Sequence, residues 1–308
     1  MARNRRGKPI HGWIAIDKPI GMTSARVVAQ VKRLTGAAKV GHGGTLDPLA
    51  TGVLPIACGE ATKTVSYVMD GIKTYRFRVR WGEARDTDDA EGTVVDASDV
   101  RPSEAAIRSA LPAFIGEIEQ VPPLFSAIKI NGERAYDLAR AGTPPEMTPR
   151  RVTIHGYELE GIPDADYADF RVVSGKGAYI RALARDLARS LGTFGHIHTL
   201  RRTAVGPFDE DHAIPLDKLE SLVHTAPAYD YLLPVATALD DIPALAMTEA
   251  EAHDLSRGQT VSLSRLVDPG RPSSFGAGVT VRVMAGGRVV ALARIEGGVV
   301  HPLRILNL

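Results

Sequence analysis

A single aspartate in a glycine-rich stretch has the setting best suited to chemistry. Residues 41–52 read GHGGTLDPLATG and place Asp47 directly before Pro48. The proline fixes its own φ and restricts the preceding residue to extended geometry, so a stiff backbone carries the carboxylate. The glycines lack the Gly-Lys-Ser/Thr ending of a P-loop and instead allow another backbone to approach closely. The spacing alone leaves two interpretations open: a catalytic carboxylate, or an Asx turn that only shapes the loop.

Other polar clusters favour structural roles over metal chemistry. His42 has no second histidine or cysteine at ligand spacing, and the pair His196 and His198 lacks an accompanying cysteine or glutamate. The acidic stretch 81–92 (WGEARDTDDAEG) lacks the spacing of an EF-hand, so we expect a solvated hairpin loop there. We therefore expect no metal. The single Cys58 excludes an internal disulfide and is typical of a reducing compartment.

The net charge of +1 hides a strong segregation along the 308 residues. Residues 1–80 carry 14 Lys and Arg against 4 Asp and Glu, and residues 171–202 carry 7 against 1. Residues 81–120 are the reverse, with 3 basic and 10 acidic side chains. The two basic segments could converge into one positive groove, the usual footprint of a polyanion, or they could be solvated faces.

Two segments near the N-terminus are predicted to carry basic and aromatic side chains. Residues 23–35 indicate an amphipathic helix with a cap at Thr23 or Ser24 and a glycine stop. Residues 73–81 (KTYRFRVRW) alternate as a strand that buries its aromatic side chains and presents a row of arginines on its other face. Tyr75 lies at the end of the apolar row, where the buried face could open into a cleft.

Further elements are predicted in the middle of the chain. Residues 152–159 and 168–173 are typical of strands. Residues 179–191 indicate a helix with leucines inward, and its arginines, beginning at Arg181, recur every four residues on the opposite side. Residues 122–142 combine a Pro-Pro turn, an Asn-Gly hairpin turn and a short helix. Their basic side chains suit phosphate contacts, although a plain surface hairpin would have the same shape.

The character of the chain changes after about residue 235. The short runs VTVRVM, RVVALARI and VVHPLRI are separated by Gly-Gly turns and preceded by a turn-rich loop at 266–279. They predict a small β-rich module appended to a larger α+β body. No apolar run approaches the ~20 residues that a membrane helix needs, and no apolar segment of a secretory signal follows the basic N-terminus. We therefore expect a cytoplasmic protein without membrane contact.

Four sequence blocks, taken in order, resemble the TruB family of pseudouridine synthases, the stand-alone bacterial tRNA pseudouridine-55 synthases. The blocks are IAIDKPIGMTS (14–24), VGHGGTLDPLATGVLPIACGEATK (40–63), PPLFSAIKINGERAYDLARAG (122–142) and SGKGAYIRALARDLARSLG (174–192) with LRRTAVGPF (200–208). The resemblance covers about residues 10–210, and long ordered matches are far more specific than one short motif. Arg85 departs from the pattern, which more often has threonine there; we expect this change to affect loop packing or RNA contact.

The resemblance implies an α+β pseudouridine synthase fold, with a large, mainly antiparallel mixed sheet and a central cleft. It implies a catalytic domain at 1–235 with an RNA-binding insertion at about 122–150, and a PUA-like RNA-binding domain at 236–308. The implied reaction converts uridine 55 in the TΨC arm of tRNA: the N1–C1′ bond breaks, the uracil rotates, and C5 bonds to C1′. It implies no cofactor, no metal and no obligatory protein partner, and we expect a monomer.

The resemblance also assigns roles to individual residues. Asp47 would be the catalytic carboxylate, either attacking C1′ or removing a 2′ proton, with Arg181 paired to it. Tyr75 would stack on a uracil flipped out of the RNA, and Leu200 would form the opposite wall of the pocket. Tyr179 would support the pair formed by the carboxylate and the arginine.

Residues outside the base pocket receive supporting roles. His42 would fill the space that the flipped base leaves in the RNA, where an aromatic ring can stack. Lys18 and Pro19 would shape the floor of the cleft. Phosphate contacts are expected from a set of basic residues, which makes binding sensitive to salt. These are Lys63, Arg76, Lys129, Arg134, Arg201 and Arg202.

Two other interpretations remain open at this point. One is a related enzyme directed by a guide RNA and partner proteins, against which the compact length and the block at 122–142 argue. The other is an RNA-binding or RNA-folding module without catalysis. The presence of Asp47, Tyr75 and Arg181 together argues against pure binding, although a folding role could coexist with catalysis.

Overall fold

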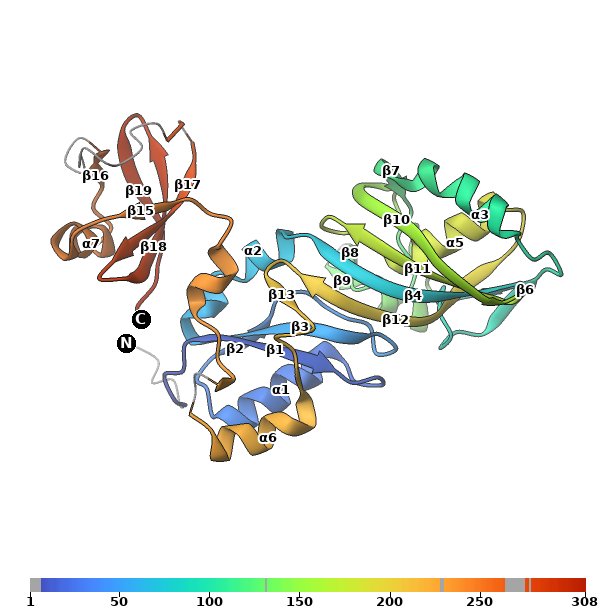
Figure 1. Ribbon diagram of the computed structural model, residues 1–308, viewed down its shortest axis with the longest axis horizontal. Helices are drawn as coiled ribbons and strands as arrows, with labels where there is room; N and C mark the ends of the chain where they lie inside the picture. The colour runs from blue at the N-terminus through green and yellow to red at the C-terminus, as the bar shows by residue number, and fades with distance from the viewer. Residues whose placement is uncertain (1–6, 131, 228–229, 264–274, 277) are drawn as a thin grey trace.

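The computed structural model describes residues 7–130, 132–227, 230–263, 275–276 and 278–308 (Figure 1). Within these ranges the chain forms a larger body on a ten-stranded sheet and a smaller C-terminal unit on a five-stranded sheet. The predicted α+β class is confirmed. Asn131 of the predicted hairpin turn and most of the predicted loop at 266–279 lie outside the described residues. No helix in the described ranges is long and apolar enough to cross a membrane.

The large sheet has the strand order β14-β1-β3-β12-β4-β11-β10-β7, with β13 paired to β12 and β2 paired to β3. All neighbours are antiparallel except β1–β14 and β3–β12, so the sheet is mixed and mainly antiparallel as predicted. Its strands are β1 (Gly12–Lys18), β2 (Val40–His42), β3 (Thr51–Cys58), β4 (Lys73–Trp81), β7 (Gly116–Gln120), β10 (Arg150–Asp164), β11 (Tyr167–Ser174), β12 (Gly195–Val205), β13 (Phe208–Asp209) and β14 (Ile214–Pro215).

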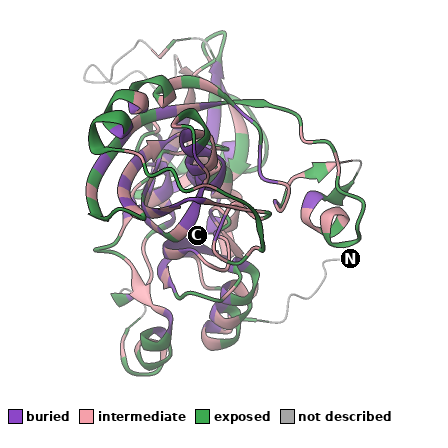
Figure 2. Cartoon of the chain, turned by 90° about the vertical axis from the view of Figure 1, so that its right-hand side faces the viewer, coloured by how far each residue is buried: buried purple, intermediate pink, exposed green. Residues whose placement is uncertain are grey.

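Strand β4 lies in the middle of this sheet and has the predicted bounds. Its aromatic face is buried, and Phe77 stacks on Phe170 of β11 with ring centroids 5.5 Å apart. Burying such a side chain stabilises the fold by ~2 kcal/mol. The strands predicted at 152–159 and 168–173 are present as β10 and β11 and are longer than predicted. Figure 2 shows that buried residues follow the strands inside the body, whereas outer turns of the helices are exposed.

The parallel contact between β3 and β12 depends on one glycine. Gly52 pairs with Arg202 at φ 98°, and a Cβ at this position would lie 2.2 Å from Arg202 O. Only glycine permits both the positive φ and the close approach of the two backbones. The loop that carries Asp47 therefore enters the sheet where β3 meets β12.

The two long helices predicted from the sequence are both present. Helix α1 spans Ser24–Thr35, with the Thr23 side chain accepting from Arg26 N–H and Gly36 in the left-handed conformation at its end. Helix α5 spans Ile180–Ser190. The other helices of the body are η1 (Gly59–Lys63), α2 (Val65–Asp70), α3 (Glu104–Ala110), η2 (Leu111–Phe114), α4 (Ala135–Arg140), α6 (Leu216–Thr225) and η4 (Val235–Leu239). Two hairpins complete the body: β5 (Glu83–Arg85) with β6 (Val94–Ala97), and β8 (Lys129–Ile130) with β9 (Glu133–Arg134).

The C-terminal unit contains the three predicted runs as strands β17, β18 and β19. Its sheet has the order β15-β17-β18-β19-β16, and α7 packs against it. The elements are β15 (Ala244–Ala246), α7 (Glu249–Ser256), β16 (Val261–Ser262), β17 (Thr280–Ala285), β18 (Arg288–Glu296) and β19 (Val299–Ile305). Leu306 is buried in an apolar cluster with Val53 of β3, which joins the unit to the body. The boundary at 235 and 236 falls within η4, whose residues belong to the same cluster, and it stays a prediction.

Candidate active site

The loop between β2 and β3 that carries Asp47 is held by buried hydrogen bonds. Gly43 N–H donates to Pro55 O at 2.8 Å. The buried Ser24 hydroxyl at the start of α1 donates to Leu46 O at 3.0 Å and accepts from Leu46 N–H at 2.8 Å. Because both sides of the loop are fixed in this way, the direction of the aspartate side chain is set by the fold.

Lys18 is fully buried beside the same loop. Its Nζ donates to Pro19 O at 2.9 Å, to Met22 O at 2.7 Å and to Pro48 O at 3.3 Å. Gly21 N–H also donates to Pro48 O, at 2.8 Å. Burial lowers the pKa of Lys18 to about 8. The structure thus places Lys18 at the end of β1 and Pro19 just after it, before a turn that is tied to the proline following Asp47.

Arg181 is the partner of Asp47. Its Nε lies 2.9 Å from Asp47 Oδ2 and 3.6 Å from Asp89 Oδ2. Its Nη1 donates to Thr87 O at 2.7 Å, and its Nη2 donates to Phe125 O at 2.9 Å. The arginine side chain is 5% exposed and the Asp47 side chain 38% exposed. Hydrogen bonds to the protein therefore fix the guanidinium, whereas the carboxylate remains accessible to a substrate.

A cavity of about 330 Å³ opens at Asp47. Tyr75, Tyr179 and Leu200 line it together with Asp47 and Arg181, so the structure brings these five predicted residues together. Tyr75 and Leu200 come from the adjacent strands β4 and β12 and are 9% and 7% exposed. Burial raises the pKa of the Tyr179 phenol, which keeps it neutral at physiological pH.

The remaining charged side chains of this cavity are cations. Lys73, Arg150, Lys176 and Arg202 line it, and Asp47 is the one carboxylate among its described lining residues. Burial lowers the pKa of Lys73 to about 8, and its Nζ donates to Gly71 O at 2.5 Å. A cavity that combines one fixed carboxylate with surrounding positive charge suits a reaction on a sugar-phosphate substrate.

His42 lies just outside the cavity lining, at the end of β2. Its Nδ1 accepts a hydrogen bond from Gly44 N–H at 3.3 Å. Burial, and then the nearby charge of Arg202, lower the pKa of His42, so its ring is neutral above the ordinary histidine pKa. The base-flipping role stays a prediction.

The structure corrects the phosphate contact predicted for Arg202. This residue is 1% exposed, and its guanidinium donates to Val53 O at 2.8 Å and to Gly44 O at 3.0 Å. It therefore holds the loop that carries Asp47 against β3 and is not a surface contact. Arg201 is also engaged, in two hydrogen bonds of 3.0 Å to the Asp17 carboxylate and one to Glu210.

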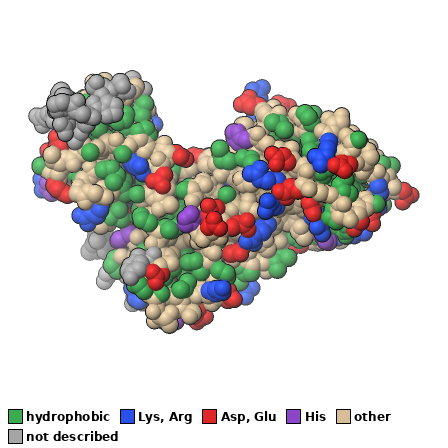
Figure 3. Space-filling model, in the orientation of Figure 1, with side chains coloured by type: hydrophobic (Ala, Val, Ile, Leu, Met, Phe, Trp, Pro, Cys, Tyr) green, Lys and Arg blue, Asp and Glu red, His purple; other side chains and the backbone are tan. Residues whose placement is uncertain are grey.

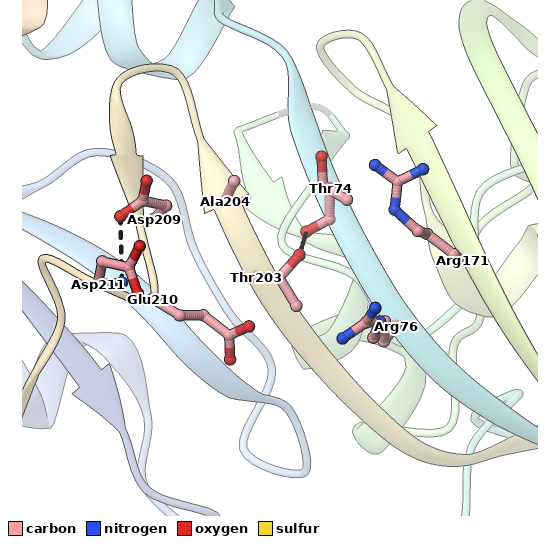
Figure 4. A pocket seen from close by; sticks show the side chains of 8 residues that line it. All are labelled: Thr74, Arg76, Arg171, Thr203, Ala204, Asp209, Glu210 and Asp211. Atoms are coloured by element: carbon pink, nitrogen blue, oxygen red, sulfur yellow. Dashed lines mark hydrogen bonds between the residues drawn. The ribbon is translucent and has the colours of Figure 1, made fainter.

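The arginine row of β4 faces away from the cavity. Because side chains alternate along a strand, Tyr75 lines the cavity while Arg76 lines a second hollow of about 340 Å³ on the other face. Figure 4 shows Arg76 and Arg171 there, with Asp209 and Glu210 on the opposite wall. Figure 3 shows positive and negative side chains interspersed over the middle of the molecule.

Arg76 and Arg78 of this row pair with carboxylates on β10 and β11. Arg76 Nε lies 3.0 Å from Glu160 Oε1, and Arg78 forms two hydrogen bonds to Asp169, at 2.6 and 2.8 Å. The Arg76 side chain is 59% exposed and lines the hollow opposite the cavity, and its predicted phosphate contact stays a prediction. Local alternation predicted the row but could not predict the partners of Arg76 and Arg78, which lie more than eighty residues away in the sequence.

The other predicted phosphate contacts differ in their surroundings. Lys63 Nζ donates to Ile305 O at 2.7 Å and pairs with Glu60, so it links the body to the C-terminal unit. Lys129 and Arg134 are exposed on the β8–β9 hairpin, and Arg134 Nη1 donates to the Tyr136 hydroxyl at 2.8 Å. The hairpin residues remain candidates for RNA contacts.

The acidic stretch 81–92 belongs to a hairpin as predicted, but it is only partly solvated, which corrects our expectation. Asp89 is 3% exposed and lies against Arg181, and Asp88 Oδ2 accepts from Arg185 Nη1 at 2.8 Å. The arginine face of α5 is accordingly not a free basic stripe. The sequence carried a signal for this contact, because the acidic segment and the basic helix have opposite charge. No group of three or more His, Cys, Asp or Glu that could hold a metal occurs among the residues described.

Comparison with known proteins identifies the class to which this fold and site belong. The model of the TruB family pseudouridylate synthase N-terminal domain matches residues 32–180, and that of the tRNA pseudouridylate synthase B C-terminal domain matches residues 181–240. The molecule is thus a pseudouridine synthase.

Curated relatives narrow this class. The tRNA pseudouridine synthase B of Rhodospirillum rubrum is 57% identical over 308 residues, covering 100% of both chains. That of Gluconacetobacter diazotrophicus is 58% identical and covers 99% of this chain and 100% of the relative. The chain belongs to the TruB family, and it is an enzyme that forms pseudouridine in tRNA.

Solved structures agree with the fold. A chain in a Cbf5-Nop10-Gar1 complex is 26% identical with a TM-score of 0.75, and the alignment covers 100% of this chain and 91% of that chain. A chain in an H/ACA RNP bound to a substrate RNA containing 2′-deoxyuridine has a TM-score of 0.75 at 24% identity, which supports the fold alone. The predicted pseudouridine synthase fold, with a large mixed sheet and a small C-terminal β unit, is confirmed.

Proposed function

We propose that this enzyme converts uridine 55 in the T arm of tRNA to pseudouridine, with Asp47 as the catalytic carboxylate. The observation that carries the proposal is the pair of Asp47 and Arg181 at the mouth of a cavity lined by two tyrosines and a leucine. The carboxylate attacks C1′ or removes the 2′ proton, and either step releases uracil from the N1–C1′ bond. The uracil then rotates and C5 bonds to C1′, which displaces the carboxylate or, on the other route, returns the 2′ proton to the ribose. The C5 proton is lost and N1 gains a proton, so the product is an isomer of uridine.

The cavity would receive the nucleotide after it leaves the RNA stack, which costs a few kcal/mol. Tyr75 stacks on the uracil and assists proton transfer at C5, Leu200 packs on the other side, and Tyr179 supports the ion pair. His42 enters the space left in the RNA. Lys129 and Arg134 on the hairpin of the insertion contact phosphates, and the module at 236–308 adds RNA contacts.

We propose that the enzyme works as a monomer in the cytoplasm, without a cofactor and without a guide RNA. The relatives in complexes with Nop10 and Gar1 are only 26% identical, whereas the bacterial tRNA pseudouridine synthases are more than 50% identical over the whole chain. The purified protein should therefore modify an isolated T-arm stem-loop when no other component is present.

The test maps pseudouridine in that stem-loop after incubation with the purified protein. A stem-loop with cytidine in place of uridine 55 serves as the control. The proposal predicts one pseudouridine, at position 55, and none in the control. Modification at other uridines, or a requirement for an added RNA or protein, would contradict it.

A further inference from the structure

Gln120 joins the end of β7 to the start of α5. Its side chain is buried, with 2% of the residue exposed. The Gln120 Nε2 donates to Tyr179 O at 3.1 Å, and its Oε1 accepts from Tyr179 N–H at 2.8 Å. A primary amide presents a donor and an acceptor side by side, so this one side chain satisfies both backbone groups of Tyr179.

Tyr179 is the residue from which α5 begins. It stands at the N-cap, and its side chain makes no capping hydrogen bond. Its carbonyl also accepts from Leu183 N–H at 3.0 Å, which is the first hydrogen bond of the helix. Because the helix has no side-chain cap of its own, the Gln120 carboxamide fixes the position of its first turn.

The first turn of α5 positions two side chains of the cavity. The ring of Tyr179 lines the cavity, and Arg181, two residues later, reaches Asp47 at 2.9 Å. The chain that follows Gln120 contacts the same helix, since Phe125 O accepts from Arg181 Nη2 at 2.9 Å. A displacement of the helix start would therefore move the tyrosine and the arginine together.

We propose that Gln120 is a positioning residue for pseudouridine formation: its carboxamide sets the helix start, and thereby the geometry of Tyr179, Arg181 and Asp47. The proposal rests on the proposed roles of these three residues. Gln120 is not among the residues that line the cavity, so it acts through Tyr179. A misplacement of about 1 Å at a reacting group can cost 100-fold in rate, whereas tRNA contacts elsewhere would be unchanged.

Two substitutions test the carboxamide itself. Gln120→Met keeps the length of the side chain and removes both hydrogen bonds. Gln120→Glu can donate and accept like the amide when its carboxyl is protonated, but it can only accept when ionised, and one oxygen then faces Tyr179 O. Glu119→Gln, at an exposed position on the same strand, is the matched control.

The charged groups around residue 120 affect the ionisation of the carboxyl group in Gln120→Glu. Arg150 of β10 pairs in register with Gln120, and Arg185 of α5 donates to Val121 O at 2.8 Å. Arg181 lies on the same helix. These cations favour the ionised carboxyl, and burial opposes it. The Tyr179 phenol stays neutral across the range tested, because the ordinary tyrosine pKa lies above this range and burial raises the pKa of Tyr179 further.

The readouts are kcat for pseudouridine formation on bulk unmodified tRNA, the Kd for tRNA, and the urea unfolding midpoint. The Gln120→Met variant is expected to lose about 10- to 100-fold in kcat while Kd stays within about twofold. The ratio of Gln120→Glu kcat to wild-type kcat should fall as the pH is raised from about 5.5 to about 8.5. Glu119→Gln should match the wild type at every pH.

The inference is overturned if Gln120→Met keeps the wild-type kcat, if kcat and tRNA affinity fall together, or if Gln120→Glu keeps the wild-type kcat at every pH. If the methionine variant does not fold, the kcat of the glutamate variant across the pH range alone decides. Because kcat is measured on bulk unmodified tRNA, this test does not depend on the assignment of the modified uridine to position 55. An inactive Asp47→Asn beside a fully active Gln120→Met would refute the positioning role and leave the proposed catalytic carboxylate intact.

Discussion

Replacing Arg181 with methionine would remove a guanidinium from between two carboxylates. Asp89 is 3% exposed, and its Oδ2 lies 3.6 Å from Arg181 Nε. A buried charge that loses its partner typically destabilises a protein by 3–5 kcal/mol, so the free energy of unfolding should fall by about 3–5 kcal/mol. Urea denaturation measures this loss, and pseudouridine formation on tRNA measures the accompanying loss of activity.

A second substitution separates the contribution of Arg181 to stability from its contribution to activity. Adding Asp89→Asn to Arg181→Met removes the uncompensated charge and should return about 1–3 kcal/mol of stability. Activity should not return, because Asp47 still lacks its partner. Arg189→Met at the exposed end of the same helix is the control and should change stability by less than about 0.5 kcal/mol. The reasoning is refuted if Arg181→Met stays within about 1 kcal/mol of the wild type, or if the double variant is no more stable than the single one.

Three further predictions follow from the contacts around the site. Burial lowers the pKa of Lys18 from 10.5 to about 8, so the unfolded chain binds the Lys18 proton more tightly than the folded chain does. In urea titrations, the free energy of unfolding of the wild type relative to Lys18→Met should therefore rise by about 1–3 kcal/mol between pH 8 and pH 10.5. A constant difference between the two proteins would contradict this. Gly52→Ala should destabilise by about 2–4 kcal/mol in the same assay, since its Cβ would lie 2.2 Å from Arg202 O; a loss below about 1 kcal/mol would contradict it. In tRNA binding, Lys129→Ala should weaken the affinity and reduce the slope of log affinity against log salt concentration by about one. Arg76→Ala should leave the affinity and this slope unchanged. The reverse result would restore the arginine row of β4 as a candidate RNA surface.

Much of the fold follows from local patterns in the sequence. The bounds of α1 and β4 are set by a cap, a glycine stop and strict alternation, all of which act within a few residues. The restraint on Asp47 is equally local, because the following proline acts on the adjacent peptide. The alternation in β4 also indicated that Tyr75 lies at the edge of the cavity, since it is at the end of the buried face of that strand.

The environment of Arg181 could not be predicted in the same way. Its contacts include Thr87, ninety-four residues away, and Phe125, fifty-six residues away, and no local pattern encodes such pairings. The acidic stretch that reads as a solvated hairpin is partly buried at Asp88 and Asp89, because α5 supplies counter-charges to these two residues. The interior position of Arg202 could not be predicted for a related reason, since a basic residue that donates to backbone carbonyls has no sequence signature.

The most direct test of the central claim compares Asp47→Asn with the wild type on a T-arm stem-loop. The substitution keeps the size of the side chain and removes the charge that pairs with Arg181. The account predicts that pseudouridine formation falls by at least about 100-fold while RNA affinity stays within a few-fold of the wild type. A variant that retains near-wild-type turnover would contradict the assignment of Asp47 as the catalytic carboxylate.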